Sequence, residues 1–323
     1  MSVADPIRGF REVPLASIRV DSITEFDIHI QTRRDRPPIL FREKSLPVTS
    51  AVLGMLVDQR HNHIYIPAAQ TFEYRRYVGK YIEDILSDRR LPVDAKCEVL
   101  YDSAQGLMAD ILEQPRSKEL VQCGQNVVAG TVRFMMQERA ALSYLLQLVS
   151  YDYYTYTHSV NVCVFSLALA QRSGITDFET LRLLGEGALL HDVGKSLIDP
   201  SVTKCKKGLT EEQWDIMRKH PVYGYQLLTE HGMLHGASLD IVRHHHEKVN
   251  GTGYPDGLRG KTIAPLVRIS TIADVFDALT TRRTYRDAMA SFHALSLMKS
   301  EMGRQLDQDL FRTFVEMMGN PAI

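Results

Sequence analysis

The sequence predicts a mainly α-helical protein, with an all-helical bundle at the C-terminus and a small α/β module at the N-terminus. Two observations support this fold class, and a third indicates a site within the bundle. Short segments with alternating apolar residues occur only before about residue 75. After residue 70 the apolar residues recur with helical spacing, and no convincing strand follows. Eight of the twelve histidines lie between His158 and His246, which is the density expected of a metal site.

The composition excludes several classes of protein. The 323 residues have room for two domains, and 44% hydrophobic with 24% charged residues is ordinary for a globular chain. Lys and Arg total 38 against 39 Asp and Glu, so we expect neither a nucleic-acid polymer nor a membrane as partner. The four cysteines are widely spaced, residues 1–6 resemble no leader, and no apolar run approaches a membrane span, so we expect a cytoplasmic protein with reduced thiols.

Residues 1–75 are expected to form the small α/β module. Strands are predicted at 26–30, 39–41 and 63–66, and a helix at 48–57. His61 and His63 lie beside a turn without carboxylates at useful spacing, so we expect them to be solvated surface residues.

Residues 76–147 are expected to form a helical linker region. From Gln70 to Val149 the pattern is helix after helix, interrupted at Pro92 and Pro115. The apolar residues between Ser117 and Val149 cover more than one stripe of a helix, so this segment needs neighbours on two sides. It is either a core helix that joins the domains or the contact of a homodimer.

Residues 148–323 continue as helices. A capping box at Thr210–Gln213 opens one helix, which places His220 near its far end. Another helix runs from 238 to 246, a Gly-rich loop from 247 to 263, and helices over 264–281 and 291–318 close the bundle.

The centre of this region is the pair His191-Asp192, which ends an apolar helical run. Adjacent helical residues point about 100° apart, so the imidazole and the carboxylate can approach a metal from two sides, and the carboxylate can bridge two ions. Gly194 is expected to end the helix in a left-handed turn. Nitrogen and oxygen ligands suit Fe, Mn, Zn or Ni. The remaining ligands are expected from His158, His220, His245, His246 and Asp274.

Several separated motifs resemble the HD-GYP domain, a subgroup of the HD phosphohydrolases, over roughly residues 148 to 320. They are His158-Ser-Val-Asn-Val, His191-Asp-Val-Gly-Lys195, Lys219-His-Pro221, His245-His-Glu247 with Gly251-Thr-Gly-Tyr-Pro-Asp-Gly-Leu258, and Ala273-Asp-Val-Phe-Asp277. The resemblance implies an HD-type helical bundle for residues 148–323, and a regulatory role for the N-terminal module of residues 1–75. It also implies a cyclic di-GMP phosphodiesterase that yields linear pGpG, GMP or both.

The expected cofactor is a pair of divalent metal ions, iron first and manganese second. We expect one metal on His158, His191, Asp192 and Asp274, and the other on Asp192, His220, His245 and His246. A bridging water or hydroxide would be the nucleophile in an in-line displacement at phosphorus. The turn before His158 holds Tyr154, with Asp152 further back, so a binuclear centre is predicted and not a third metal.

A further set of residues is expected to act beside the metals. Asp192 and Lys195 are expected to be catalytic, with Lys195 stabilising the charge on phosphorus. Substrate contacts are expected from Lys195, Tyr254, Asp277, Arg283 and Arg286, and Asp277 alternatively orients a ligand. The Gly-Tyr-Pro loop around Tyr254 implies docking of diguanylate cyclase (GGDEF) domains.

Two alternatives stay open. The chain is a catalytically silent cyclic dinucleotide receptor, or it is a phosphodiesterase for another cyclic dinucleotide such as cyclic GMP-AMP. His231, His235 and His244 are expected not to bind metal. Asn250 replaces the usual Asp of the loop, and Thr284 the usual Pro of the basic segment, without removing a ligand.

Overall fold

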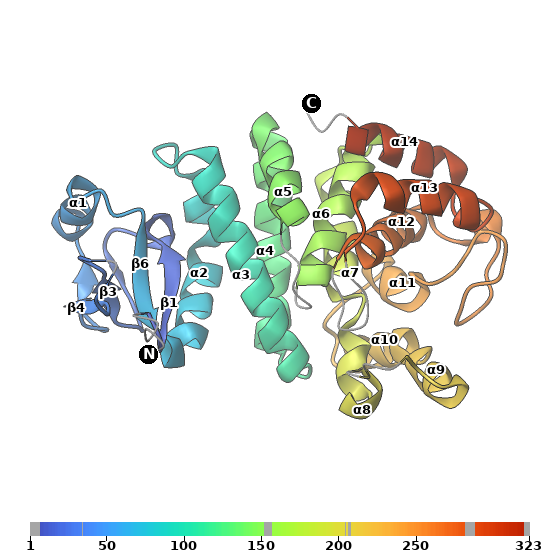
Figure 1. The fold of residues 1–323 in the computed structure, drawn as a ribbon, viewed down its shortest axis with the longest axis horizontal. Coiled ribbons are helices and arrows are strands. Elements are labelled where there is room, and N and C mark those ends of the chain that lie inside the picture. The colour runs from blue at the N-terminus through green and yellow to red at the C-terminus, as the bar shows by residue number, and fades with distance from the viewer. Residues whose placement is uncertain are drawn as a thin grey trace. The chain divides into compact units, whose positions relative to one another are not determined.

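The computed structural model describes residues 7–33, 35–151, 157–203, 205, 208–281 and 288–319. The chain forms two compact units, Met1–Ser103 and Ala104–Ile323 (Figure 1). In the described residues all named strands belong to the first unit, and the second is built from helices. The mainly α fold class with a small N-terminal α/β module is therefore confirmed. The three-part division at residues 75 and 147 stays a prediction.

The N-terminal unit contains an antiparallel sheet with the strand order β1-β6-β3-β4. Its strands are β1 (Phe10–Pro14), β6 (His63–Pro67), β3 (Ile28–Ile30) and β4 (Ile39–Arg42), and β2 (Ser22–Ile23) pairs with β5 (Pro47–Val48). The helices are α1 (Ser50–Asp58) and α2 (Thr71–Ser87). The three strands expected from alternation are present. Its core includes Phe26, whose ring lies 5.4 Å from those of Tyr74 and Tyr77 of α2.

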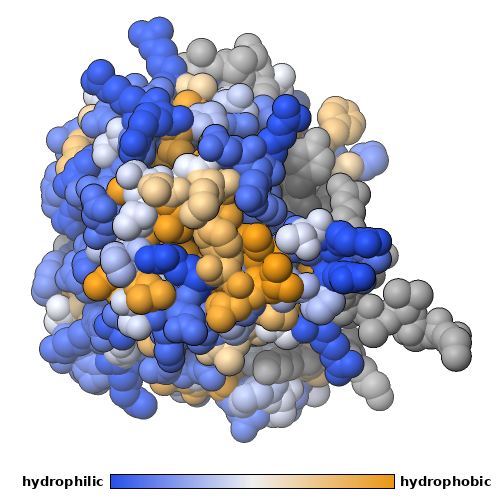
Figure 2. Space-filling model, turned by 90° about the vertical axis from the view of Figure 1, so that its left-hand side faces the viewer, coloured by the Kyte–Doolittle hydropathy of each residue, from blue (hydrophilic) through white to orange (hydrophobic). Residues whose placement is uncertain are grey.

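Figure 2 looks at the N-terminal unit and shows apolar side chains gathered near the middle of that face. The exposed large apolar residues of this unit include Ile23, Ile39, Leu40 and Met55, which are 49% to 56% exposed. Ile39 and Leu40 belong to β4, which is an edge strand of the sheet. His63, in β6, has a side chain that is 44% exposed, as expected for a surface residue.

Helices make up the second unit, and α3 (Val93–Glu113) leads into it. They are α4 (Lys118–Gln137), α5 (Arg139–Tyr151), α6 (Thr157–Arg172), α7 (Phe178–Leu190), α8 (Pro200–Thr203), α9 (Glu211–Met217), α10 (His220–Glu230), α11 (Ala237–His244), α12 (Pro265–Thr280), α13 (Ser291–Met302) and α14 (Gln308–Gly319). Among the described residues, none of these helices combines the length and the apolar character needed to cross a membrane.

Three predicted helix boundaries were wrong. The segment 117–149 is two helices, because the backbone of Glu138 is extended (φ −116°, ψ 101°). The segment 291–318 is also two helices, α13 and α14. His220 does not end the helix that starts at Thr210 but begins α10, because Pro221 lacks an N–H and therefore fits a first turn.

The capping box at Thr210 is confirmed, since the Thr210 side chain accepts from the backbone N–H of Gln213 and the Gln213 side chain accepts from that of Thr210. Asp177 caps α7 by accepting a hydrogen bond from the backbone N–H of Thr180. These caps fix where the helices that lead to His191 and His220 begin.

Two features hold the bundle around the site. The rings of Phe165 (α6), Phe276 (α12) and Phe314 (α14) lie 5.0–6.0 Å apart in edge-to-face pairs. On α7, a Cβ added to Gly187 would lie 2.8 Å from Ser238 O and Ile241 Cβ, so the backbones of α7 and α11 are in close contact there. Close contact at this point aligns the C-terminal ends of α7 and α11, which carry the histidines of the site.

Candidate metal centre

Helix ends bring the seven predicted ligands together. His191 follows α7 directly, Asp192 precedes the 3₁₀ helix Val193–Leu197, and His220 begins α10. His245 and His246 follow α11, His158 lies in the first turn of α6, and Asp274 lies in the middle of α12. Six of the seven are no more than 8% exposed, and the side chain of His246 is 21% exposed.

One group of side chains surrounds Oδ2 of Asp192. His158 Nε2 lies 3.6 Å and His191 Nε2 3.4 Å from this oxygen. The same two nitrogens lie 3.2 Å and 3.9 Å from Oδ1 of Asp274. These four side chains are the ones that the sequence assigned to a first metal.

A second group surrounds the other oxygen of Asp192. His220 Nε2 lies 3.2 Å and His245 Nε2 3.9 Å from Asp192 Oδ1. The potential ligand atoms of Asp192, His220, His245 and His246 all lie within 4.8 Å of one another. Asp192 therefore lies between the two groups, with one oxygen toward each.

Hydrogen bonds fix the tautomer of three imidazoles. Nδ1 of His191 lies 2.7 Å from Ala188 O, Nδ1 of His220 2.8 Å from Met217 O, and Nδ1 of His245 3.0 Å from Val242 O. A carbonyl oxygen only accepts, so each Nδ1 carries the proton and each Nε2 of the neutral ring has a free lone pair. All three lone pairs face the carboxylates.

The electrostatics favour neutral imidazoles and charged carboxylates at this site. Burial lowers the pKa of His220, and burial together with the neighbouring histidines lowers the pKa of His245 well below its usual range. Burial opposes ionisation of Asp192, yet the neighbouring Lys195 ammonium holds the pKa of this carboxyl well below its usual range. This is the protonation state that binds a metal cation.

His158 differs in the metal-free protein. Burial alone would lower its pKa, but hydrogen bonds to Asp274 and Asp277 raise the pKa of His158 to about 9. A proton therefore occupies the position that a cation would take, and metal binding there releases it.

The donor set fits divalent cations. His191 Nε2 and Asp192 Oδ1 are buried without a hydrogen-bond partner among the described residues. His220 Nε2 and His245 Nε2 are only 3.2 Å apart, although both are acceptors when their Nδ1 atoms donate to carbonyls. These lone pairs and the carboxylate repel one another, and a cation bound between them would be coordinated by all three groups. Imidazole and carboxylate donors without thiolate suit Fe, Mn, Zn or Ni.

Asp277 lies behind His158. Its Oδ2 accepts from His158 Nδ1 at 2.6 Å, its Oδ1 accepts from Asn161 Nδ2 at 2.8 Å, and the residue is 1% exposed. Both oxygens are thus occupied inside the protein. Of the two roles expected for Asp277, this position fits orientation of a ligand, and the expected substrate contact is not supported.

Lys195 lies on the open side of Asp192. Its Nζ is 2.5 Å from Asp192 Oδ2, and its side chain is 30% exposed. The residue lies in the 3₁₀ helix 193–197 and not after a left-handed turn, because Gly194 does not have a positive φ. Gly194 serves close approach instead: an added Cβ would lie 2.0 Å from His220 O. The expected left-handed turn at Gly194 was therefore wrong.

The loop around Tyr254 is held by Glu247, to which no role was assigned from the sequence. Glu247 is 1% exposed and accepts from the backbone N–H groups of residues 256 and 257 on Oε1 (2.7 and 3.0 Å) and of residue 258 on Oε2 (3.0 Å). The ring of Tyr254 lies 4.8 Å from that of His246 at an angle of 35°. The position of Glu247, directly after the paired histidines and before a Gly-rich loop, was the sequence signal from which its role could have been inferred.

The glycines of this loop have two different functions. Gly251 has a positive φ (80°), which favours glycine. Gly253 does not, but an added Cβ would lie 2.4–2.5 Å from backbone atoms of residues 247 and 248, so only glycine fits.

Two other predicted groups are placed differently. His244 Nε2 lies 2.9 Å from Asp256 Oδ2, and Asp256 also pairs with Arg243, so His244 faces away from the proposed ligands. This agrees with the expectation that His244 is not a ligand. Arg283 and Arg286, expected to bind phosphate, lie outside the described residues.

Comparisons with known proteins point in the same direction. The HD domain family matches residues 155–310. A cyclic di-GMP phosphodiesterase of Pseudomonas aeruginosa is 37% identical over 180 residues, which cover 55% of this chain and 43% of that protein. A 3'3'-cGAMP-specific phosphodiesterase of Vibrio cholerae is 35% identical over 158 residues, 49% of this chain and 34% of that protein.

A solved structure extends the likeness to both units of the fold. An HDG"Y"P protein of Bdellovibrio bacteriovorus covers 96% of this chain and 100% of its own, with a TM-score of 0.65 and 24% identity. At this identity the likeness concerns the fold alone. The chain spans less than half the length of the curated relatives given above. The resemblance to the HD-GYP family is confirmed by these matches.

Proposed function

We propose that the chain is a metal-dependent phosphodiesterase of the HD-GYP type that hydrolyses cyclic di-GMP to pGpG, GMP or both, and the HD domain match over residues 155–310 supports this proposal. One observation carries the proposal. Seven side chains from distant segments converge in two groups that share Asp192. The printed activity of the Pseudomonas aeruginosa relative supports the substrate.

We propose that His158, His191, Asp192 and Asp274 hold one divalent metal, and that Asp192, His220, His245 and His246 hold the other. When bound, two such ions lower the pKa of water and offset negative charge on a phosphodiester. Iron is the first choice and manganese the second, because both accept mixed imidazole and carboxylate ligands.

The protein's own residues have separate tasks in this proposal. Asp192 holds the two groups together, since each of its oxygens faces one of them. Lys195 keeps a positive charge beside Asp192 with a partly exposed side chain, so it can reach a phosphate oxygen and stabilise developing charge. Tyr254 covers His246 on the open side of the site and offers its ring to the substrate. Arg283 and Arg286 are kept as proposed phosphate contacts.

The direct test is release of pGpG or GMP from cyclic di-GMP by the reduced, iron-loaded chain. We expect Lys195→Ala to lower kcat about 100- to 1000-fold, because it removes one preorganised positive charge. Lys219→Ala is the matched control, since Lys219 is exposed and precedes His220, and it should retain full activity. No turnover with iron or manganese would contradict the proposal.

A second substrate is supported by the relative from Vibrio cholerae, whose printed name is a 3'3'-cGAMP-specific phosphodiesterase. Competition between cyclic di-GMP and 3'3'-cGAMP in one assay separates the two substrates. The silent-receptor alternative predicts tight binding of either dinucleotide without hydrolysis, and the complete set of seven donors argues against it.

Partners and location also remain proposals. We propose that the loop around Tyr254 docks diguanylate cyclase (GGDEF) domains and that residues 1–75 regulate the enzyme. A homodimer through α4 and α5 is proposed because Met136 and Tyr144 are exposed there, at 50% and 39%. A cytoplasmic location is proposed because the four cysteines are widely spaced in the sequence, as is typical of reduced thiols.

A further inference from the structure

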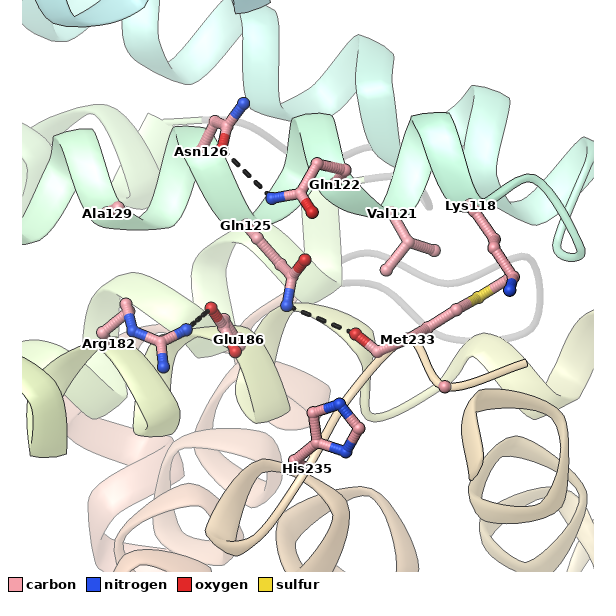
Figure 3. A pocket seen from close by; sticks show the side chains of 11 residues that line it. Lys118, Val121, Gln122, Gln125, Asn126, Ala129, Arg182, Glu186, Met233 and His235 are labelled. Carbon is pink, nitrogen blue, oxygen red and sulfur yellow. Dashed lines mark hydrogen bonds and ion pairs between the residues drawn. The ribbon is translucent and has the colours of Figure 1, made fainter. Parts of the chain in front are cut away.

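A second polar cavity lies in the C-terminal unit, and none of the seven proposed metal ligands lines it. Its volume is about 440 Å³, and its walls come from α4, from α7 and from the segment between α10 and α11 (Figure 3). This volume lies within the range of sites that bind small molecules, which is roughly 300–1,000 Å³.

One wall of the cavity carries three carboxamides. Gln122, Gln125 and Asn126 of α4 all line it. Gln122 Nε2 donates to Asn126 Oδ1, and Gln125 Nε2 donates to Met233 O, both at 3.3 Å. These hydrogen bonds are long, so a bound molecule can replace them. A carboxamide offers a donor and an acceptor side by side, as the edge of a nucleobase does.

The charges of the lining favour an anion. Glu186 is the only acidic residue among the described residues that line the cavity, and it is already paired with Arg182. Lys118 and His235 also line the cavity, both are exposed, and no carboxylate pairs with either in the described part of the chain. The unpaired charge of the cavity lining is therefore positive, and it lies on the exposed side of the cavity.

The floor of the cavity is a buried network that the metal centre does not use. Glu186 is 2% exposed, and burial raises the pKa of its carboxyl. Ser238 Oγ, at the start of α11, lies 3.4 Å from Glu186 Oε2 and donates to Leu183 O at 2.9 Å. This network ties α7 to α11 and holds the Glu186 side chain in place at the floor of the cavity.

We propose that this cavity binds a nucleoside monophosphate, with the base against the carboxamides of α4 and the phosphate near Lys118 and His235. Carboxamides without cations would suit a neutral molecule, and cations without carboxamides would suit free phosphate. The combination in a cavity of this volume selects a molecule that carries both a heterocycle and a phosphate. The proposal does not depend on the phosphodiesterase activity.

Binding can be measured apart from catalysis, on the full chain stripped of metal by a chelator. Isothermal titration with GMP, AMP and inorganic phosphate should show that at least one nucleotide binds more tightly than phosphate. The double variant Gln122→Ala/Asn126→Ala should weaken nucleotide binding about tenfold or more, and Lys118→Ala should do the same through the phosphate. All three residues are exposed, so these variants should fold normally.

Gln137→Ala is the matched control, because Gln137 is exposed on the same helix and does not line the cavity. It should bind the nucleotide as the unmodified chain does. The proposal is overturned if neither GMP nor AMP binds at millimolar concentration, if the cavity variants bind as tightly as the control, or if phosphate binds as tightly as the nucleotides. Because the measurement needs no turnover, a chain that binds GMP but hydrolyses nothing would reject only the proposed function.

Discussion

The substitution Gly194→Ala tests how the site is assembled. Gly194 lies in the His191-Asp-Val-Gly-Lys195 motif, but it has no side chain that could bind a metal, and its φ is not positive. What it provides is space, because the turn after Asp192 contacts the first turn of α10 at this residue. The substitution adds one methyl group and no charge.

The expected magnitude follows from the two nearest atoms. An added Cβ would lie 2.0 Å from His220 O and 2.5 Å from Gly224 N. Both are backbone atoms, so rotation of a side chain cannot relieve the contact. Overpacking in a core costs about 1–3 kcal/mol, and we expect about 3 kcal/mol or more here. Because the turn must move away from α10, Asp192 and His220 separate from their present 3.2 Å, and metal affinity should fall about 10- to 100-fold.

The assay is chemical denaturation of the metal-free protein, followed by metal analysis after dialysis against iron. Gly124→Ala is the matched control. Gly124 lies within helix α4, and an added Cβ would contact only side-chain atoms, at 3.5–3.9 Å. That control should leave the free energy of unfolding unchanged or raise it by up to about 1 kcal/mol. If Gly194→Ala unfolds and binds iron as Gly124→Ala does, the close contact between the turn and α10 is not what assembles the site.

Three further predictions concern residues around the centre. Glu247→Gln should raise KM for cyclic di-GMP about tenfold with a smaller change in kcat, because an amide NH₂ replaces an oxygen that accepts from the loop that positions Tyr254. Asp277→Asn should weaken iron binding about 10- to 100-fold in equilibrium dialysis, because it removes the carboxylate that orients His158. At pH 8, iodoacetamide should modify Cys205 but spare Cys163 in the native protein, because burial raises the pKa of the Cys163 thiol to about 12 and keeps it protonated and inaccessible.

Each of these has a clear contrary result. A Glu247→Gln protein with unchanged KM would mean that the loop does not need its carboxylate. Full iron affinity in Asp277→Asn would remove the positioning role of Asp277. Mass spectrometry that finds Cys163 alkylated as fast as Cys205 would show that α6 opens readily to solvent.

Residue types and their order predicted much of the site. The imidazoles and carboxylates at 158, 191, 192, 220, 245, 246 and 274 could be named from sequence, because metal-binding donors are rare in apolar helices and recur here in order. The N-terminal strands could be predicted because their alternation has a period of two.

Features that depend on contacts between distant segments could not be predicted. The role of Gly194 follows from the path of α10, 26 residues later, which no local pattern encodes. The hydrogen bonds of Glu247 could not be predicted, because they depend on how the following loop folds back. Only in the folded chain does the carboxylate accept hydrogen bonds from three backbone N–H groups of that loop. The break at Glu138 was missed because helical periodicity continues on both sides of a single extended residue.

The central claim is that two cations share Asp192 in a centre that hydrolyses a cyclic dinucleotide. The most direct measurement is metal analysis of anaerobically purified protein, paired with cyclic di-GMP turnover in the same sample. We expect about two iron or manganese ions per chain together with release of pGpG or GMP. The Asp192→Ala protein should have lost the bound metal and the turnover. Turnover that persists after the metals are removed, or that survives in Asp192→Ala, would contradict it.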